Sequence, residues 1–228
     1  MQAAAGELVT KRGEDSRVGS TLRRVRLLSK QRRFAEAESE IKVQISEFPG
    51  RCELHAALGY VYKKRTRTVE AVEQFKWAHE FGKPRCETYW HWSEIEADRE
   101  EWSESERIAK LGVASFRTDA GLLFRQGYAL QRLGKEYVQT ARRPEGLKKC
   151  ADAQAVLERA LQNCEADQSN RSLRTKILRT LVLSGEIRED IGLTVKFFAQ
   201  WDTLLPGDPN FATEKDRLAQ RYAVLSER

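Results

Sequence analysis

Small side chains recur at intervals of 34 residues through the first half of the chain. Ala37, Ala71 and Ser105 follow this spacing, and Leu58 and Gly59 have counterparts one interval later. A period of this length is typical of α-solenoids, in which each unit is a pair of antiparallel helices. One such pair cannot bury its apolar face alone, so neighbouring pairs must stack. The spacing therefore predicts an all-α fold.

The second unit carries the most complete pattern. Its residues run His55-x2-Leu58-Gly59-x2-Tyr62, then Ala71-x3-Phe75, Ala78 and Pro84. This order resembles the tetratricopeptide repeat (TPR) family, with His in place of the usual Trp and the Pro one residue late. The resemblance covers roughly residues 18–165. The third unit, with Tyr89, Trp92 and Trp102, also has some half-a-TPR character.

The resemblance implies a TPR-like α-solenoid of stacked antiparallel helix hairpins with a divergent C-terminal capping helix. Residues 1–17 lack periodicity and are expected to form a flexible N-terminal tail, and residues 18–228 a single repeat domain. The expected units are residues 18–51, 52–85, 86–119 and 120–167, followed by a divergent end over residues 168–228.

The fourth unit fits the period only with an insertion, because Ser105 and Ala153 are 48 residues apart. Residues 135–148 are expected to form an extended helix end and a basic loop, in which Pro144 stops any continuous helix. Beyond residue 165 the register is lost, although apolar stripes at helical spacing continue. Thr213 and Asp216 predict a capping box at the start of the last helix.

Positive charge is concentrated at the start of the sequence. Residues 1–34 contain nine Lys or Arg against three acidic residues, which accounts for all of the net charge of +6. An acidic block follows from Glu94 to Glu106. Such asymmetry can attract an acidic protein or a nucleic acid. The plainer interpretation is that these charges lie on solvated helix faces.

The motifs of common enzyme classes are missing. The sequence has no glycine-rich phosphate loop, no His-Glu-x-x-His and no Gly-x-Ser-x-Gly, so we expect no enzyme, no cofactor and no small-molecule substrate. Cys52 with His55 and Cys86 with His91 could form a zinc site only from separate helices. Reduced, partly buried cysteines and no metal are expected instead.

No apolar stretch approaches the roughly 18–20 residues that span a bilayer. The first residues also lack the basic start and apolar stretch of a secretory signal. We therefore expect a cytoplasmic protein without a membrane partner.

The TPR resemblance also implies a concave groove lined by the first helix of each hairpin. The fifth, ninth, twelfth and thirteenth residues of each unit would face it. On this count the partner-binding residues are expected to be Arg26, Lys30, Tyr60, Lys63, Lys64, Trp90, Glu94, Phe124, Tyr128 and Arg132. The same count adds Leu22, Ser29, Ala56, Ala97, Asp98 and Gln131.

The expected groove combines four aromatic residues with a basic rim, and aromatic residues and Arg often anchor protein interfaces. For Trp90 and Phe124, packing between hairpins is the alternative interpretation. TPR domains that clamp chaperone tails carry Asn at the ninth position of successive units, whereas this chain has Tyr60, Glu94 and Tyr128. The sequence therefore argues against a chaperone-tail role.

The leading hypothesis is a protein-protein interaction scaffold or adaptor that binds a partner segment in the concave groove. The expected partner is another protein or a peptide segment, an acidic one in view of the basic rim. One alternative is a nucleic-acid-associated (RNA or single-strand) helical repeat protein, because basic residues with aromatics bind single strands. Another is the sensor or recognition module of a larger signalling or defence ATPase.

Overall fold

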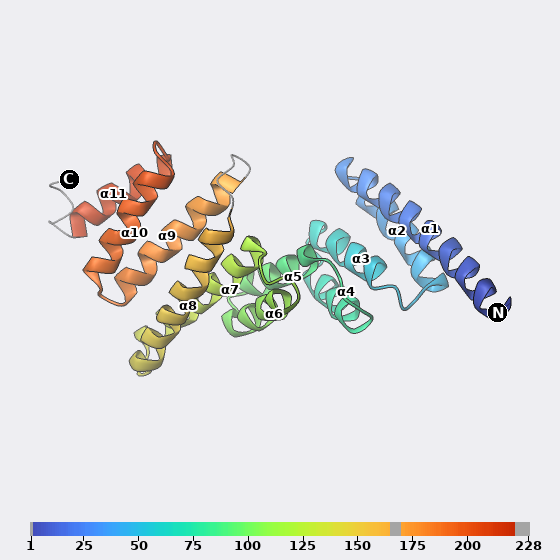
Figure 1. The fold of residues 1–228 in the computed structure, drawn as a ribbon, viewed down its shortest axis with the longest axis horizontal. Coiled ribbons are helices and arrows are strands. Elements are labelled where there is room, and N and C mark those ends of the chain that lie inside the picture. Colours follow the sequence, from blue (N-terminus) through green and yellow to red (C-terminus); the bar gives the residue numbers. More distant parts are fainter. Residues whose placement is uncertain (1, 165–169, 222–228) are drawn as a thin grey trace. The chain divides into compact units, whose positions relative to one another are not determined.

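The computed structural model describes the backbone of residues 2–164 and 170–221, with side chains from residue 13 onward within those ranges. These ranges contain eleven helices and no strand (Figure 1), so the expected all-α fold is confirmed. The contacts divide the chain into two compact units, residues 1–95 and 96–228, which are described separately.

The first unit consists of two helix pairs and most of a fifth helix. The helices are α1 (Gln2–Lys30), α2 (Phe34–Glu47), α3 (Cys52–Lys64), α4 (Thr68–Glu80) and α5 (Cys86–Asp98), of which α5 crosses the unit boundary. Ala37 and Ala71 are completely buried, as their spacing predicted. A Cβ atom on Gly59 would lie 2.6 Å from the ring of Phe75, so α3 and α4 approach too closely for any side chain there.

The 34-residue period also appears in the backbone of the turns. Arg32, Thr66 and Glu100 have positive φ angles of 61°, 60° and 62°. In each turn the amide of the next residue donates to a carbonyl five residues earlier, as from Arg67 to Tyr62 at 3.0 Å. This left-handed residue closes the first helix of each hairpin and starts the second.

The start of α1 differs from the sequence expectation. Residues 2–17 are helical, although we expected a flexible tail over residues 1–17. Asp15 pairs with Arg51, and Arg17 pairs with Glu47. α1 has 29 residues and its partner α2 only 14, so much of α1 has no part of α2 to pack against. For this reason the apolar residues at the start of α1 show little helical periodicity. The domain boundary at residue 18 stays a prediction.

The second unit holds the rest of α5 and six further helices. These are α6 (Trp102–Ser115), α7 (Ala120–Gln139), α8 (Arg143–Asn163), α9 (Arg171–Ile187), α10 (Ile191–Leu204) and α11 (Pro209–Arg221). One apolar core runs through α7 to α11, and Leu157, Leu181 and Trp201 lie fully buried within it.

The insertion lengthens both helices of the fourth hairpin. α7 and α8 have 20 and 21 residues, whereas α3 and α4 have 13 each. Of the extended helix end and basic loop expected over residues 135–148, the structure has the first, because α7 continues to Gln139. The expected basic loop is wrong, since only residues 140–142 separate the helices. Pro144 lies in the first turn of α8, where its missing N–H costs no helical hydrogen bond, so it begins a helix.

The long hairpin is closed by two glycines. A Cβ atom on Gly146 would lie 2.7 Å from the carbonyl oxygen of Gly134 and from the amide nitrogen of Val138. The buried thiol of Cys150 lies against Gly134. Burial raises the pKa of this thiol to about 11. The inserted residues thus form a tightly packed pair of helices.

The register expected to be lost beyond residue 165 returns in a fifth hairpin. Glu189 has a φ of 57°, and the amide of Asp190 donates to the carbonyl of Gly185 at 3.0 Å. This is the turn geometry of the earlier hairpins. Thr194-x3-Phe198 then stands where Ala71-x3-Phe75 stands in the second unit of the repeat. Threonine at the small position hides the match in the sequence.

The last helix begins four residues before the expected capping box. α11 starts at Pro209, and Asp208 caps it by accepting from the amide of Asn210 at 2.9 Å. Thr213 lies inside the helix, where its hydroxyl donates to the carbonyl of Pro209. The predicted box at Thr213 and Asp216 is therefore wrong.

Ion pairs hold α11 against α9. Buried Glu186 accepts from Arg217 and Arg221, and buried Glu214 accepts from Arg179 and Arg217. Two buried carboxylates thus share three Arg side chains, which satisfies the charges that the core would otherwise leave unpaired.

Candidate functional site

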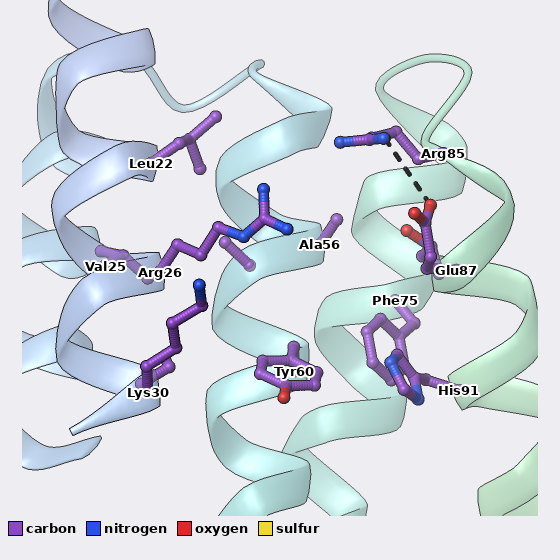
Figure 2. A pocket seen from close by; sticks show the side chains of 13 residues that line it. Leu22, Val25, Arg26, Lys30, Ala56, Tyr60, Phe75, Arg85, Glu87 and His91 are labelled. Carbon is purple, nitrogen blue, oxygen red and sulfur yellow. Dashed lines mark ion pairs between the residues drawn. The ribbon is translucent and has the colours of Figure 1, made fainter. Parts of the chain in front are cut away.

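A pocket of about 520 Å³ opens in the first unit between α1, α3 and the start of α5 (Figure 2). It is lined by Leu22, Val25, Arg26, Ser29, Lys30, Ala56, Ala57, Tyr60, Phe75, Arg85, Glu87, Thr88 and His91. Six of these lie at positions that the TPR resemblance placed on the concave face: Leu22, Arg26, Ser29, Lys30, Ala56 and Tyr60.

The wall formed by α1 is basic. Arg26 and Lys30 are one helical turn apart, so their side chains extend from the same face of α1 into the pocket (Figure 2). Both are exposed, and neither forms an ion pair with any residue whose side chain the structure describes. The hydroxyl oxygen of Ser29, also on this wall, is buried and has no hydrogen-bond partner among the side chains and backbone that the structure describes. This wall can therefore receive an anion.

The wall formed by α3 and α4 is apolar and aromatic. Phe75 of α4 is buried at its base, and the small side chain of Ala56 on α3 also lines the pocket. The ring of Tyr60 faces the pocket in Figure 2. The ammonium group of Lys64 lies 5.3 Å from the centre of this ring, at a distance typical of a cation–π contact. An apolar side chain could pack here.

The side formed by α5 carries the pocket's negative charge. The Arg85 Nε atom lies 3.6 Å from an oxygen of Glu87, and both side chains are exposed (Figure 2). Burial works to raise the pKa of Glu87, but the backbone hydrogen bond, the Cys86 thiol and the charge of Arg85 together lower it. Glu87 is thus ionised at neutral pH.

His91 lies deeper on the same side. Its Nδ1 atom accepts from the Nζ atom of Lys63 at 3.0 Å, and its ring centre is 5.2 Å from that of Tyr60. Burial lowers the pKa of His91, and the charges of Lys63 and Lys64 act in the same direction, against the opposing effect of Glu94. His91 is therefore neutral at pH 7, with its proton on Nε2.

Lys63 does not contribute a free charge to the pocket. It forms a half-buried ion pair with Glu94, and its ammonium group lies 5.4 Å from the centre of the Trp90 ring. Lys63, Trp90 and Glu94 were all expected to line the groove, and in the structure Lys63 contacts both of the others. The contact joins two consecutive repeats, and the sequence pattern within one repeat does not reveal it.

The remaining expected groove residues belong to the second unit. Phe124 is part of the apolar core and stacks on Tyr128 at 5.9 Å, which supports the packing interpretation for Phe124. Tyr128 also meets the edge of Trp102, and the guanidinium of Arg132 lies 4.5 Å from the Trp102 ring centre. These residues form a cluster between α6 and α7. A single continuous groove through all ten residues stays a prediction.

Sequence reasoning missed the residues that α5 adds to the pocket. Glu87 and His91 lie one helical turn apart on the face of α5 that lines it. His91 occupies the position equivalent to Ala57, which is 34 residues earlier and also lines the pocket. Comparing the sixth positions of the second and third units would have found His91, whereas Glu87 lies at the second position and gives no such signal.

The exposed surface of α4 carries a second unexpected feature. Trp77 and Phe81 stack at 5.4 Å, although each is about 40% exposed. They lie outside the pocket lining.

The potential metal-ligating side chains of the described part of the chain are dispersed. No cluster there has three or more His, Cys, Asp or Glu side chains placed to hold a metal ion. Cys52 and Cys86 are half-buried, Cys150 and Cys164 are buried, and all four are free thiols. Within the same ranges, no helix combines the length and apolar character needed to cross a membrane.

No protein-family model matches the sequence, and no curated protein matches it significantly. Solved structures do resemble it in fold. A TPR protein from Parabacteroides merdae has a TM-score of 0.66 at 12% identity, over 90% of this chain and 73% of its own. MamA has a TM-score of 0.64 at 15% identity, over 82% of this chain and 92% of its own.

MamA from Desulfovibrio magneticus RS-1 has a TM-score of 0.61 at 13% identity, over 83% of this chain and 97% of its own. These identities are low, so the likeness concerns the fold. It agrees with the hairpins that repeat every 34 residues and with their left-handed turns. The chain therefore has the fold of a TPR-type repeat protein.

Proposed function

We propose that the chain is a protein-interaction scaffold or adaptor whose first unit binds a partner segment in the pocket between α1, α3 and α5. The segment presents an acidic side chain beside an aliphatic one. One observation carries this proposal: Arg26 and Lys30, which pair with no acidic side chain among the described residues, face an apolar wall that includes Tyr60. Solenoids of stacked repeats commonly present such surfaces to other proteins.

The two walls suit two different side chains. A carboxylate at Arg26 and Lys30 gains charge-assisted hydrogen bonds, for which the planar guanidinium of Arg is well shaped. An aliphatic side chain packs against Tyr60 and Phe75. The pocket volume of about 520 Å³ lies within the usual range for small-ligand sites, so it accommodates a few side chains of an extended segment.

The test uses a labelled peptide of alternating Glu and Leu, acetylated and amidated at its ends, titrated into the full chain by fluorescence anisotropy. Arg26→Met should weaken binding by about tenfold or more, since a charge-assisted hydrogen bond is lost. Tyr60→Ala should weaken it by about 2 kcal/mol, as expected of an aromatic anchor. Arg23→Met is the matched control, because Arg23 is exposed on α1 outside the pocket.

Two outcomes would contradict the proposal. Equal losses for Arg23→Met and Arg26→Met would show that only general charge matters. Undiminished binding of a peptide with Gln in place of Glu would show that the basic wall does not recognise carboxylates.

Nucleic acid is the second candidate, supported by the basic residues of α1 and by Lys64 beside Tyr60. Such binding would depend on the phosphate charges of the nucleic acid. The logarithm of the affinity would therefore fall steeply and linearly with the logarithm of the salt concentration. Arg23, Arg24 and Arg26 would then contribute similarly. Titration of a single-stranded RNA at two salt concentrations separates the two functions. A role as recognition module of a larger signalling or defence ATPase is compatible with either.

A further inference from the structure

We propose that protonation of His91 strengthens the binding of the acidic segment, so that the pocket responds to pH. This inference rests on the proposed function of the pocket. His91 lines the pocket from α5, across from Arg26 and Lys30 on α1 (Figure 2). A charge gained on its ring therefore adds to the field that receives the segment's carboxylate.

The contact with Lys63 defines the neutral state. The ammonium group of Lys63 can only donate, so the Nδ1 atom of His91 accepts through its lone pair at 3.0 Å. A proton on Nδ1 removes this hydrogen bond and places two positive charges side by side. The carboxylate of Glu94 already lies 3.8 Å from the same Nδ1 atom and forms an ion pair with Lys63.

Protonation thus changes how Glu94 is shared. In the neutral state Glu94 balances Lys63, and the three side chains together carry no net charge. In the protonated state Nδ1 donates to Glu94, which then faces two cations. The group gains one positive charge on the α5 side of the pocket, which Glu87 and its partner Arg85 also line.

Charged and titratable groups from three helices face His91. These groups are Tyr60, Lys63 and Lys64 from α3, Glu87 and Glu94 from α5, and Arg26 and Lys30 from α1. Glu87 titrates below its usual range, so it stays ionised between pH 5.5 and 7.5. Between pH 5.5 and 7.5 the imidazole is the group that changes.

Linkage gives the sign of the effect. Burial keeps the pKa of His91 low in the free protein, and a bound carboxylate favours the charged ring and raises that pKa. Binding therefore takes up a proton, and affinity increases as the pH falls. Since each pKa unit of change corresponds to a factor of ten, we expect about a three- to tenfold gain between pH 7.5 and 5.5.

The test titrates the full chain with the Glu–Leu peptide at pH 7.5 and 5.5, at constant ionic strength. The glutamates of the peptide remain largely ionised at both values. His91→Asn keeps an acceptor for Lys63 but cannot titrate, so its affinity should be the same at both pH values. His79→Gln is the matched control, because His79 bonds to the Tyr89 hydroxyl outside the pocket lining and should keep the wild-type response.

A second measurement follows the imidazole of His91 directly by NMR. Its titration midpoint should rise when the peptide is bound. Binding that is equally strong at both pH values, or a pH response that persists in His91→Asn, would overturn the role of His91 and leave the proposed function intact. A midpoint unmoved by bound peptide would also overturn it. Absence of binding at both pH values would contradict the proposed function, and this inference with it.

Discussion

Gly146 and Gly134 bring the backbones of α8 and α7 into direct contact, and a Cβ atom on Gly146 would lie 2.7 Å from the Gly134 carbonyl oxygen. Alanine is the better helix former by about 1 kcal/mol, which favours Gly146→Ala. The new Cβ atom would, however, overlap with backbone atoms of α7, which cannot rotate away as a side chain could. We therefore expect a net destabilisation of about 2 kcal/mol, measured by urea unfolding. Gly50→Ala should change little, because no atom lies within 4 Å of its Cβ position.

The left-handed turn of the second repeat offers a stabilising substitution. Thr66 has a φ of 60°, which is costly for a β-branched residue. Thr66→Asn should raise the free energy of unfolding by about 0.5–1 kcal/mol, since Asn tolerates this conformation. Thr140 ends α7 at a φ of −106°, so Thr140→Asn should bring no such gain. Thermal melts of both variants compare the two positions.

The ion pairs of α11 should matter far more than surface pairs. Arg217→Met leaves Glu186 and Glu214, both buried, with fewer partners. Breaking a buried pair costs about 3–5 kcal/mol. We expect about 2 kcal/mol here, because Arg217 is 39% exposed and Arg221 still pairs with Glu186. Arg33→Met breaks the exposed pair with Glu36 and should leave the melting temperature unchanged. Equal shifts would contradict this ranking.

Asp208 should make the second unit sensitive to acid. Burial works to raise its pKa, but hydrogen bonds from Thr175, Asn210 and Trp201 outweigh this and lower it. Its stabilisation is therefore complete above the unfolded pKa of about 3.9 and is lost as the pH falls through the lower folded value. Asp208→Asn should be less stable than wild type at pH 7, and the difference should shrink below about pH 4.

Urea unfolding at pH 7, 4 and 3 measures this convergence. Asp202→Asn serves as the control, because Asp202 is exposed on α10. A difference between wild type and Asp208→Asn that is constant with pH would show that the carboxylate charge is not what stabilises the turn.

Glu87 should limit the affinity of the pocket for purely acidic segments. Its ionised carboxylate lies on the α5 side, where it repels the segment's negative charge. Glu87→Gln should tighten the Glu–Leu peptide by about two- to threefold at low salt, an effect that weakens as salt rises. Glu80→Gln removes an exposed charge from α4 outside the pocket lining and should have no effect in the same anisotropy titration.

The repeat architecture could be predicted because its signal is local and periodic. Ala71 and Gly59 lie where α3 and α4 touch. The helices approach so closely that larger side chains do not fit at these two positions. The fifth hairpin was missed because Thr194 takes the small position and packs against Gly185 instead. A different pair of residues solves the same steric problem, so a pattern of residue types does not detect it.

The candidate site was predicted only in part, for a related reason. Counting positions along the repeat placed Arg26, Lys30 and Tyr60 at the pocket, because those positions depend on the helix face alone. It could not show that Lys63 is neutralised by Glu94, because that contact joins different repeats. Whether a charged side chain on one repeat is available to a partner depends on the side chains of the adjacent repeat, which the pattern within one repeat does not include.

The burial of Cys150 makes the opening of the α7–α8 hairpin measurable without an added label. Its thiol is covered by Gly134, and its pKa of about 11 leaves almost no thiolate at neutral pH. The thiolate is the nucleophile that attacks thiol reagents, so Cys150 is modified only after the helices separate. Half-buried Cys52 and Cys86 should react first. The slow phase that disappears in Cys150→Ala therefore reports how often the intact chain exposes this hairpin to solvent.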